Sequence, residues 1–211
     1  ETPEQGLVYD AKNLAFILPA GKYIGNSRYK DVFAASAMAD LTSFRNHWGA
    51  ETSLDVELYR PVARYELVAK DVATFLNKLS TGGLKGESFT ARVKYSDYLP
   101  TGYNLWDDVL KNSLMYMEYK VAFERPADGT KELILGFDYV LTDAGETVSI
   151  PVELEILNEK NEVLARTAFR IPCERGKNTT VRGNFLTSDA NGGIGIDPDY
   201  DGDLEVDLGE L

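Results

Sequence analysis

The chain has 211 residues, 44% of them hydrophobic, and a formal net charge of −12 at pH 7. That length is ample for burying a core, and the acidic charge argues against nucleic acid and against an anionic membrane surface as partners. The single cysteine, Cys173, excludes an internal disulfide framework, and its place in an apolar run predicts a buried thiol. The sequence holds no apolar run long enough to cross a membrane as a helix.

The most regular alternation in the chain runs from Ser53 to Leu76 and predicts two successive strands. Leu54, Val56 and Leu58 alternate with polar residues, a period of two that is typical of a strand with one face in a core. The alternation resumes after Pro61, which has no N–H for a β-ladder and is expected at an edge, a bulge or a strand junction. We predict two strand pieces that bend at this proline and run through the centre of a β domain.

Helical signals are short and few. Apolar residues at loose helical spacing predict one or two turns within residues 27–48. Asp71 precedes a second such pattern and is predicted to cap a short helix, which the run Thr81-Gly82-Gly83 would end. One more helical turn is predicted at residues 105–110, after a turn-rich loop at 98–104.

The remaining apolar segments have the length of strands in antiparallel sandwiches. They lie at residues 14–18, 88–98, 114–124, 133–141, 148–157, 163–171, 181–186, 194–196 and 204–208. Composition changes from loop to strand near residues 103–113, so we expect an N-terminal β-sandwich domain at 1–112 and a C-terminal one at 113–211. No long helices alternate with the strands, which disfavours a doubly wound sheet. The predicted fold class is all-β, with two antiparallel sandwiches in tandem and a few short helical turns.

Three segments, taken in their order and spacing, carry a family resemblance. They are Leu58–Tyr65 (LYRPVARY), Tyr98–Asn104 (YLPTGYN) and Ile171–Ser188 (IPCERGKNTTVRGNFLTS). The set resembles the fimbrillin-like surface lipoproteins of Bacteroidales, the type V pilus subunits with their anchor and tip relatives. Phe137–Val140 (FDYV) sits where such proteins often carry a similar strand. The resemblance covers roughly residues 29–200.

The resemblance implies two transthyretin-like sandwich domains in tandem, export as a lipoprotein and display at the outer membrane. It implies other fimbrial subunits, or host and bacterial surface molecules, as partners, with membrane attachment only through a lipid anchor absent from this chain. Subunits of this family polymerise by donor-strand exchange, a form of β-augmentation. The chain departs from the pattern at Glu1–Gly6, where no lipobox cysteine stands, and in a first domain that looks short of an initial strand. We interpret its start as internal or processed.

The predicted function is therefore a fimbrial or adhesin-like surface protein, and the alternative is a surface glycan- or ligand-binding module that does not polymerise. Leu204, Val206 and Leu208 alternate with acids near the C-terminus. They are interpreted either as an edge strand of their own domain, whose acids discourage pairing, or as a strand that contacts a neighbouring subunit.

An aromatic loop is the candidate for ligand contact. Tyr98, Tyr103 and Trp106 lie close together in the sequence, and loops on rigid scaffolds often carry binding. Sugar rings stack on aromatic faces, which favours a glycan as ligand. The alternative is that these aromatic side chains fill a junction between domains, because they bury large areas.

Catalytic and metal sites have little support in the sequence. The one histidine, His47, is far in sequence from Cys173, and no phosphate loop or metalloprotease motif is present. The acidic turn Asp197–Asp203 has the spacing of a calcium loop, yet Leu208 stands where an EF-hand needs glutamate, which favours a solvated turn. We expect neither enzymatic activity nor a cofactor.

Overall fold

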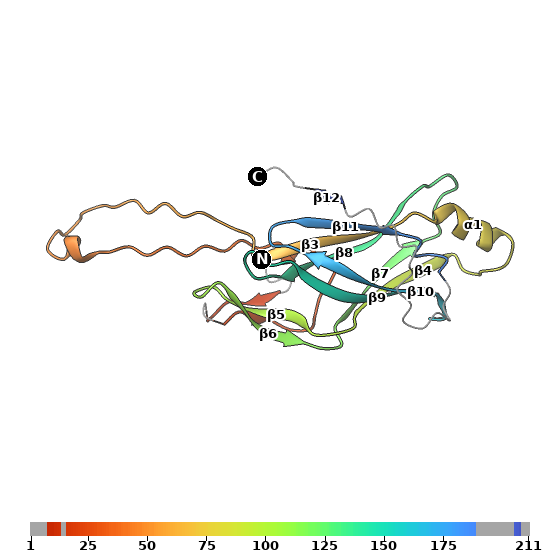
Figure 1. Cartoon of the computed structure of the whole chain (residues 1–211), viewed down its shortest axis with the longest axis horizontal. Coiled ribbons are helices and arrows are strands. Elements are labelled where there is room, and N and C mark those ends of the chain that lie inside the picture. The colour runs from red at the N-terminus through yellow and green to blue at the C-terminus, as the bar shows by residue number, and fades with distance from the viewer. Residues whose placement is uncertain (1–7, 14–15, 189–204, 208–211) are drawn as a thin grey trace.

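Two four-stranded sheets face each other across one hydrophobic core, and a long arm projects from one end of the body (Figure 1). The computed structural model describes residues 8–13, 16–188 and 205–207, with the last three as backbone only. The predicted all-β class with antiparallel sheets is confirmed. Within the described part of the chain, α1 (Val72–Ser80) is the α-helix, and two 3-10 turns occupy Arg28–Lys30 and Thr42–Phe44, as predicted for residues 27–48.

The first sheet is antiparallel throughout, and the second contains one parallel pair. In order, the first sheet consists of β10 (Val163–Cys173), β9 (Val148–Asn158), β4 (Ser88–Tyr95) and β7 (Glu118–Glu124). The second consists of β12 (Glu205–Asp207), β11 (Asn178–Gly183), β3 (Val62–Ala69) and β8 (Leu133–Leu141), with β11 and β3 parallel. Two small ribbons pair β1 (Tyr9–Asp10) with β2 (Leu18–Pro19) and β5 (Leu99–Asn104) with β6 (Val109–Leu114).

Buried and outward-facing residues alternate strictly along the strands that enclose the core. On β4, Phe89, Ala91, Val93 and Tyr95 are buried, while the residues between them face outward. This is the pattern of a strand with one face against a second sheet. A fully buried apolar side chain of this kind contributes roughly 1.5–3 kcal/mol. Cys173 on β10 is also buried, and burial raises the pKa of its thiol to about 12.

The strands do not separate at residue 112, which corrects the predicted division into domains at 1–112 and 113–211. β3 from the first half pairs with β8 and β11 from the second, and β4 pairs with β9. The inner faces of both sheets form one core cluster. Alternation indicates which face of a strand is buried but not which strand lies beside it, so one interleaved sandwich and two tandem ones have the same sequence pattern.

Residues 98–114 also differ from their prediction. The predicted loop at 98–104 forms β5, and the predicted helical turn at 105–110 is a tight turn that leads into β6. Hydrogen bonding within the hairpin overrides the weak local helical signal, as tertiary context commonly does.

The helix α1 begins after Asp71, as predicted, but the Asp71 carboxylate does not cap it. It accepts hydrogen bonds from the backbone N–H groups of Leu186 and Thr187 and from the Thr187 hydroxyl, at 2.7–3.2 Å. Asp71 thereby ties the start of the helix to the segment that follows β11.

A carboxylate at the centre of the outer face of the first sheet joins three strands. Glu155 on β9 lies opposite Arg92 on β4 and Arg166 on β10. Its oxygens accept from Arg92 Nε at 2.7 Å, Arg166 Nη2 at 2.6 Å and Lys94 Nζ at 2.9 Å. Burial alone would raise the pKa of Glu155, but the hydrogen bonds from these three cations outweigh it and lower the pKa from 4.5 to about 2.

This carboxylate generates a prediction on acid stability. The depressed pKa means that Glu155 stabilises the fold fully above about pH 4.5, and that this contribution is lost as the pH falls toward 2. We expect Glu155→Gln to lower the free energy of unfolding at pH 7 by about 1–3 kcal/mol and to flatten its pH dependence in that window. Urea unfolding at pH 7, 4 and 3 measures both effects.

Glu118→Gln is the matched control. Glu118 meets Lys120 at 4.0 Å on the surface, a pair worth about 0–1 kcal/mol. Equal losses in the two variants would show that the three-strand network does not stabilise the fold.

Candidate interaction surface

Residues 35–58 form the arm, which leaves the body between two residues that pair with each other. Ala34 and Tyr59 exchange two backbone hydrogen bonds, at 2.8 and 2.9 Å, and form an isolated antiparallel bridge. Beyond this bridge the chain extends away from the sheets, at the end of the body opposite α1 (Figure 1). The 3-10 turn Thr42–Phe44 lies in the arm.

The base of the arm is held by side chains as well as by backbone. Arg60 Nε donates to Asp31 Oδ1 at 2.9 Å, and its guanidinium lies 4.4 Å from the centre of the Phe33 ring. Pro61 is buried directly before β3, and its carbonyl accepts from the N–H of Thr142 at 3.0 Å. The predicted junction at this proline is thus the point where the arm enters the body.

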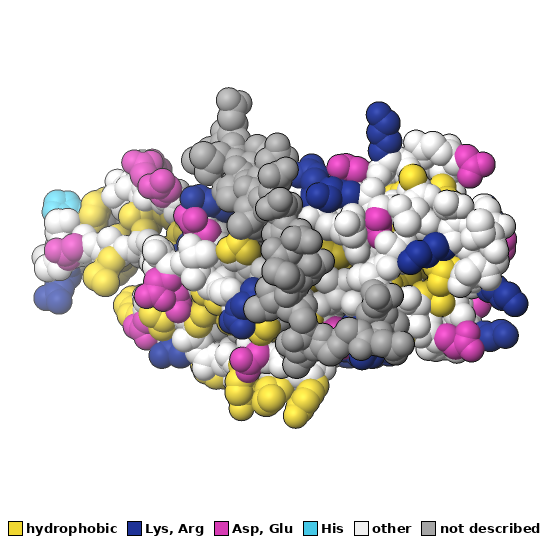
Figure 2. Space-filling model, turned by 45° about the vertical axis from the view of Figure 1, so that its right-hand side comes forward, with side chains coloured by type: hydrophobic (Ala, Val, Ile, Leu, Met, Phe, Trp, Pro, Cys, Tyr) yellow, Lys and Arg dark blue, Asp and Glu magenta, His cyan; other side chains and the backbone are white. Residues whose placement is uncertain are grey.

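The arm exposes apolar side chains that the sequence placed in a core. Leu54, Val56 and Leu58 are 54%, 47% and 64% exposed, and Trp48 is 98% exposed. Figure 2 shows the hydrophobic side chains of the arm on its surface. The predicted core strand at 53–58 is therefore corrected: alternation identifies an apolar face, but the partner for that face is not in the described part of this chain.

Residues 51–58 run as an extended trace (Figure 1) and belong to no sheet of the described structure. An extended segment with free backbone groups and side chains of alternating character can add to the edge of another sheet, where backbone hydrogen bonds supply affinity and every second side chain fills a pocket. Asp55 and Glu57 lie between the apolar residues, so one face of the added strand would be apolar and the other acidic.

Trp106 and the arm together line a hollow. The hollow has a volume of about 300 Å³ and is lined by Ser36, Ala37, Met38 and Trp106. Trp106 is 70% exposed. Its turn is held by the side-chain oxygen of Asn104, which accepts from the N–H of Trp106 at 2.9 Å. A flat aromatic face beside small side chains suits a planar or ring-shaped ligand.

The three aromatic residues predicted to contact a ligand are not in equivalent places. Tyr98 and Trp106 are exposed, whereas Tyr103 is buried in a small cluster with Val62 and Leu141. Burial and a hydrogen bond to Asp108 raise the pKa of Tyr103. Its hydroxyl accepts from Arg175 Nη2 at 2.8 Å, which fixes the hairpin to the body. Tyr103 therefore packs inside the body, which agrees with the alternative interpretation of these aromatic residues as packing.

Val206, one of the three C-terminal residues predicted to form an edge or subunit-contact strand, lies within β12. Its backbone pairs with that of Thr179 on β11. Leu204 and Leu208 lie outside the described residues, as does the predicted acidic turn Asp197–Asp203. Across the described ranges, no group of three or more potential ligand side chains is placed to hold a metal ion. Likewise, no described helix has the length and apolar character that crossing a membrane requires.

One family model matches residues 1–209. The chain belongs to the family of unknown function DUF6562. No curated protein matches it. Among solved structures, a proposed cell adhesion protein from Bacteroides ovatus aligns with 60% of this chain at 13% identity, with a TM-score of 0.36. The chain spans only 41% of the length of that protein, and a likeness at this level carries no argument about function.

The arm residues are the part of the surface that sequence reasoning missed. Their signal was present, because alternation at Ser53–Leu58 is as regular as in β4.

Removal of the arm tests whether it contributes to folding. Because Ala34 and Tyr59 already pair, a four-residue Gly/Ser loop in place of residues 35–58 can close between them. We expect the free energy of unfolding to change by less than about 1 kcal/mol, since the arm buries little and a shorter loop costs less entropy. Chemical denaturation of both chains, followed by circular dichroism, measures the difference. A loss of several kcal/mol would show that the arm packs on the body.

Proposed function

We propose that the chain is a fimbrial, adhesin-like protein of the cell surface that works by binding and carries out no reaction on a substrate. In this proposal the arm acts as a donor strand and adds to a sheet edge on a second copy. The observation that carries it is the exposed, unpaired and alternating segment Ser53–Leu58. Exposed apolar surface of this kind marks interaction sites in folded proteins.

The edge of the first sheet at β10 suits this donor. β10 is eleven residues long and is the terminal strand of its sheet among the described strands. Its inner face carries Ala165 and Ile171, beside which the apolar residues of the arm would extend the core. Its outer face carries Arg166 and Arg170.

Charge on this outer face is complementary to the arm. On β4, β9 and β10 this face holds four cations against two carboxylates, namely Arg92, Lys94, Arg166 and Arg170 against Glu153 and Glu155. Asp55 and Glu57 of an added strand would lie on that side. Complementary charge of this kind raises association rates and sets register.

The remaining parts of the proposal come from the family resemblance. They are display at the outer membrane as an exported lipoprotein and assembly with other fimbrial subunits. Attachment to the membrane would be made by a lipid anchor.

Self-association is the direct test. We expect the full chain to form dimers or longer assemblies as its concentration rises, and the variant Leu54→Ser/Val56→Ser/Leu58→Ser to weaken association by 100-fold or more, since each buried leucine or valine contributes about 1.5–3 kcal/mol. Sedimentation velocity between micromolar and millimolar concentration measures this. Ile134→Ser is the control, because Ile134 is 56% exposed and lies on β8 opposite Val68, at the end of β3 far from the arm. A chain that stays monomeric, or an arm variant that associates like the control, contradicts the proposal.

A second candidate function is glycan binding at the hollow beside Trp106, favoured by the exposure of that ring next to Met38. A glycan array probed with the full chain tests it. Any glycan that binds there should lose about tenfold or more in affinity on Trp106→Ala, because an aromatic platform supplies much of the contact area. Tyr116→Ala should leave binding unchanged. Binding that survives Trp106→Ala would place the glycan elsewhere.

A further inference from the structure

A lysine and an aspartate are buried together where the two sheets meet at β7 and β8. Lys30 Nζ lies 2.6 Å from Asp138 Oδ1, and the two side chains are 5% and 0% exposed. Asp138 is on β8, and Lys30 ends the 3-10 turn Arg28–Lys30. Taking such a pair out of water costs several kcal/mol for each ion, which the attraction between the ions repays only in part.

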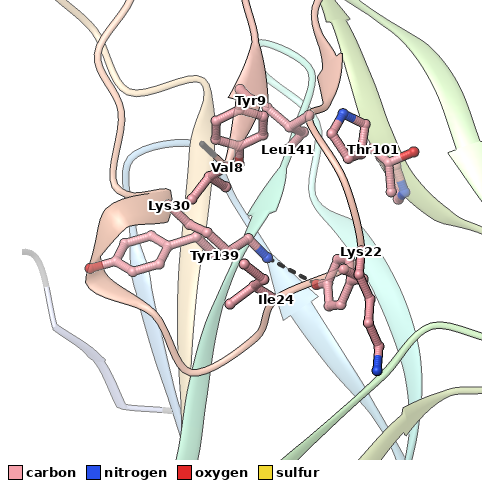
Figure 3. Close-up of a pocket in the computed structure, with 11 residues that line it drawn as sticks. Val8, Tyr9, Lys22, Ile24, Lys30, Thr101, Tyr139 and Leu141 are labelled. Carbon is pink, nitrogen blue, oxygen red and sulfur yellow. Dashed lines mark hydrogen bonds between the residues drawn. The ribbon is translucent and has the colours of Figure 1, made fainter. Parts of the chain in front are cut away.

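Tyr23 connects the amine to the second oxygen of the carboxylate. Its hydroxyl accepts from Lys30 Nζ at 2.9 Å, drawn as the dashed line in Figure 3, and donates to Asp138 Oδ2 at 2.5 Å. The Tyr95 hydroxyl donates to the same oxygen at 2.6 Å, and the N–H of Tyr139 donates to Asp138 Oδ1 at 2.8 Å. A proton can therefore pass from Nζ through the Tyr23 hydroxyl to Oδ2 without leaving the cluster.

The segment that carries Tyr23 and Lys30 is clamped onto β8. The N–H of Asn26 donates to the carbonyl of Phe137 at 3.0 Å, and the N–H of Phe137 donates back to the Asn26 side chain at 3.2 Å. Gly25 lies so close to Tyr119 that a Cβ there would be 2.2 Å from the ring. The amine and the carboxylate are thus positioned by backbone contacts on either side of them.

The surroundings favour the uncharged form of the amine. Burial lowers the pKa of Lys30, against the opposing attraction of Asp138. Burial also raises the pKa values of Tyr23 and Tyr95, so both hydroxyls keep their protons at neutral pH. A neutral amine is a nucleophile, and the proton that Lys30 gives up through Tyr23 makes the Asp138 carboxyl group an electrophile.

We propose that Lys30 and Asp138 condense spontaneously to an isopeptide bond within this cluster, with Tyr23 as the proton relay. Tyr23 first passes one proton from the ammonium to Oδ2. The Nζ–Cγ bond then forms, a second proton follows the same path, and the Cγ–Oδ2 bond breaks to release water. Nitrogen keeps one proton, Oδ1 becomes the amide oxygen, Tyr23 is regenerated and no atom changes its oxidation state.

Two features of the structure serve this step. Groups held in such proximity react as if at an effective concentration of roughly 10⁵–10⁸ M. A small hollow of about 30 Å³ borders Lys30 and Thr101 (Figure 3), which is space for the released water. Among the described residues the buried Thr101 Oγ1 has no hydrogen-bond partner, so this hydroxyl can bind that water.

The bond would join the segment before the arm to β8 by a covalent link. Pulling on the arm would then load β8 directly and would not peel the first thirty residues from the sandwich. This consequence does not depend on which partner the arm binds.

The mass of the intact, purified chain tests the proposal. We expect it to be lower than the sequence mass by one water, about 18 Da, with a cross-linked peptide that contains Lys30 and Asp138 after digestion. Lys30→Arg, which keeps the charge but cannot condense, should have its full sequence mass. Tyr23→Phe should condense at least tenfold more slowly, as expected for loss of a proton-transfer group, and circular dichroism checks that it folds.

Two results overturn the proposal. One is a wild-type chain at its full sequence mass, which shows that the pair remains an ion pair. The other is the loss of one water in Lys30→Arg as well, which would assign the loss to a succinimide elsewhere in the chain.

Discussion

The buried carboxylate of Asp138 is the constraint on which the arrangement of the molecule depends. It accepts hydrogen bonds from Lys30, Tyr23, Tyr95 and the backbone of Tyr139, so it joins β8, β4 and the segment before the arm at one point. An unpaired charge in this place would cost several kcal/mol. The segment that carries Tyr23 and Lys30 is thereby held against β8, shortly before the arm begins.

The two halves of the chain are interleaved in the same sheets. Because β3 lies between β8 and β11, neither half of the chain can complete a sheet without the other. The tyrosine hydroxyls around Asp138 belong to this junction: Tyr65 of β3 contacts Tyr95 of β4 and Tyr119 of β7 at 2.7 and 3.2 Å. Hydroxyls that pair with each other between two sheets satisfy groups that an apolar core would leave unpaired. This part of the core is in this way polar, while the part around Phe75 and Phe89 is apolar.

The arm, unlike the core, makes few contacts with the rest of the chain. Its base is tied by the Ala34–Tyr59 bridge and by Arg60, whereas its outer part keeps apolar side chains in water. A monomer gains nothing from that exposure, so the apolar residues make physical sense as one half of an interface. A rigid base with an unpaired outer part is also the arrangement that allows a segment to order on a partner without disturbing the body.

Local pattern alone determined the all-β class, the faces of β3, β4, β8, β9 and β10, the helix after Asp71 and the buried state of Cys173. A period of two, or apolar residues at helical spacing, acts within a few neighbouring positions. Only the tertiary structure decided which strands pair, that Tyr103 packs inside while Trp106 does not, and that Ser53–Leu58 leaves the core. Those outcomes depend on contacts between residues far apart in the chain, such as Lys30 with Asp138. The alternation within one segment does not indicate which other segment it pairs with.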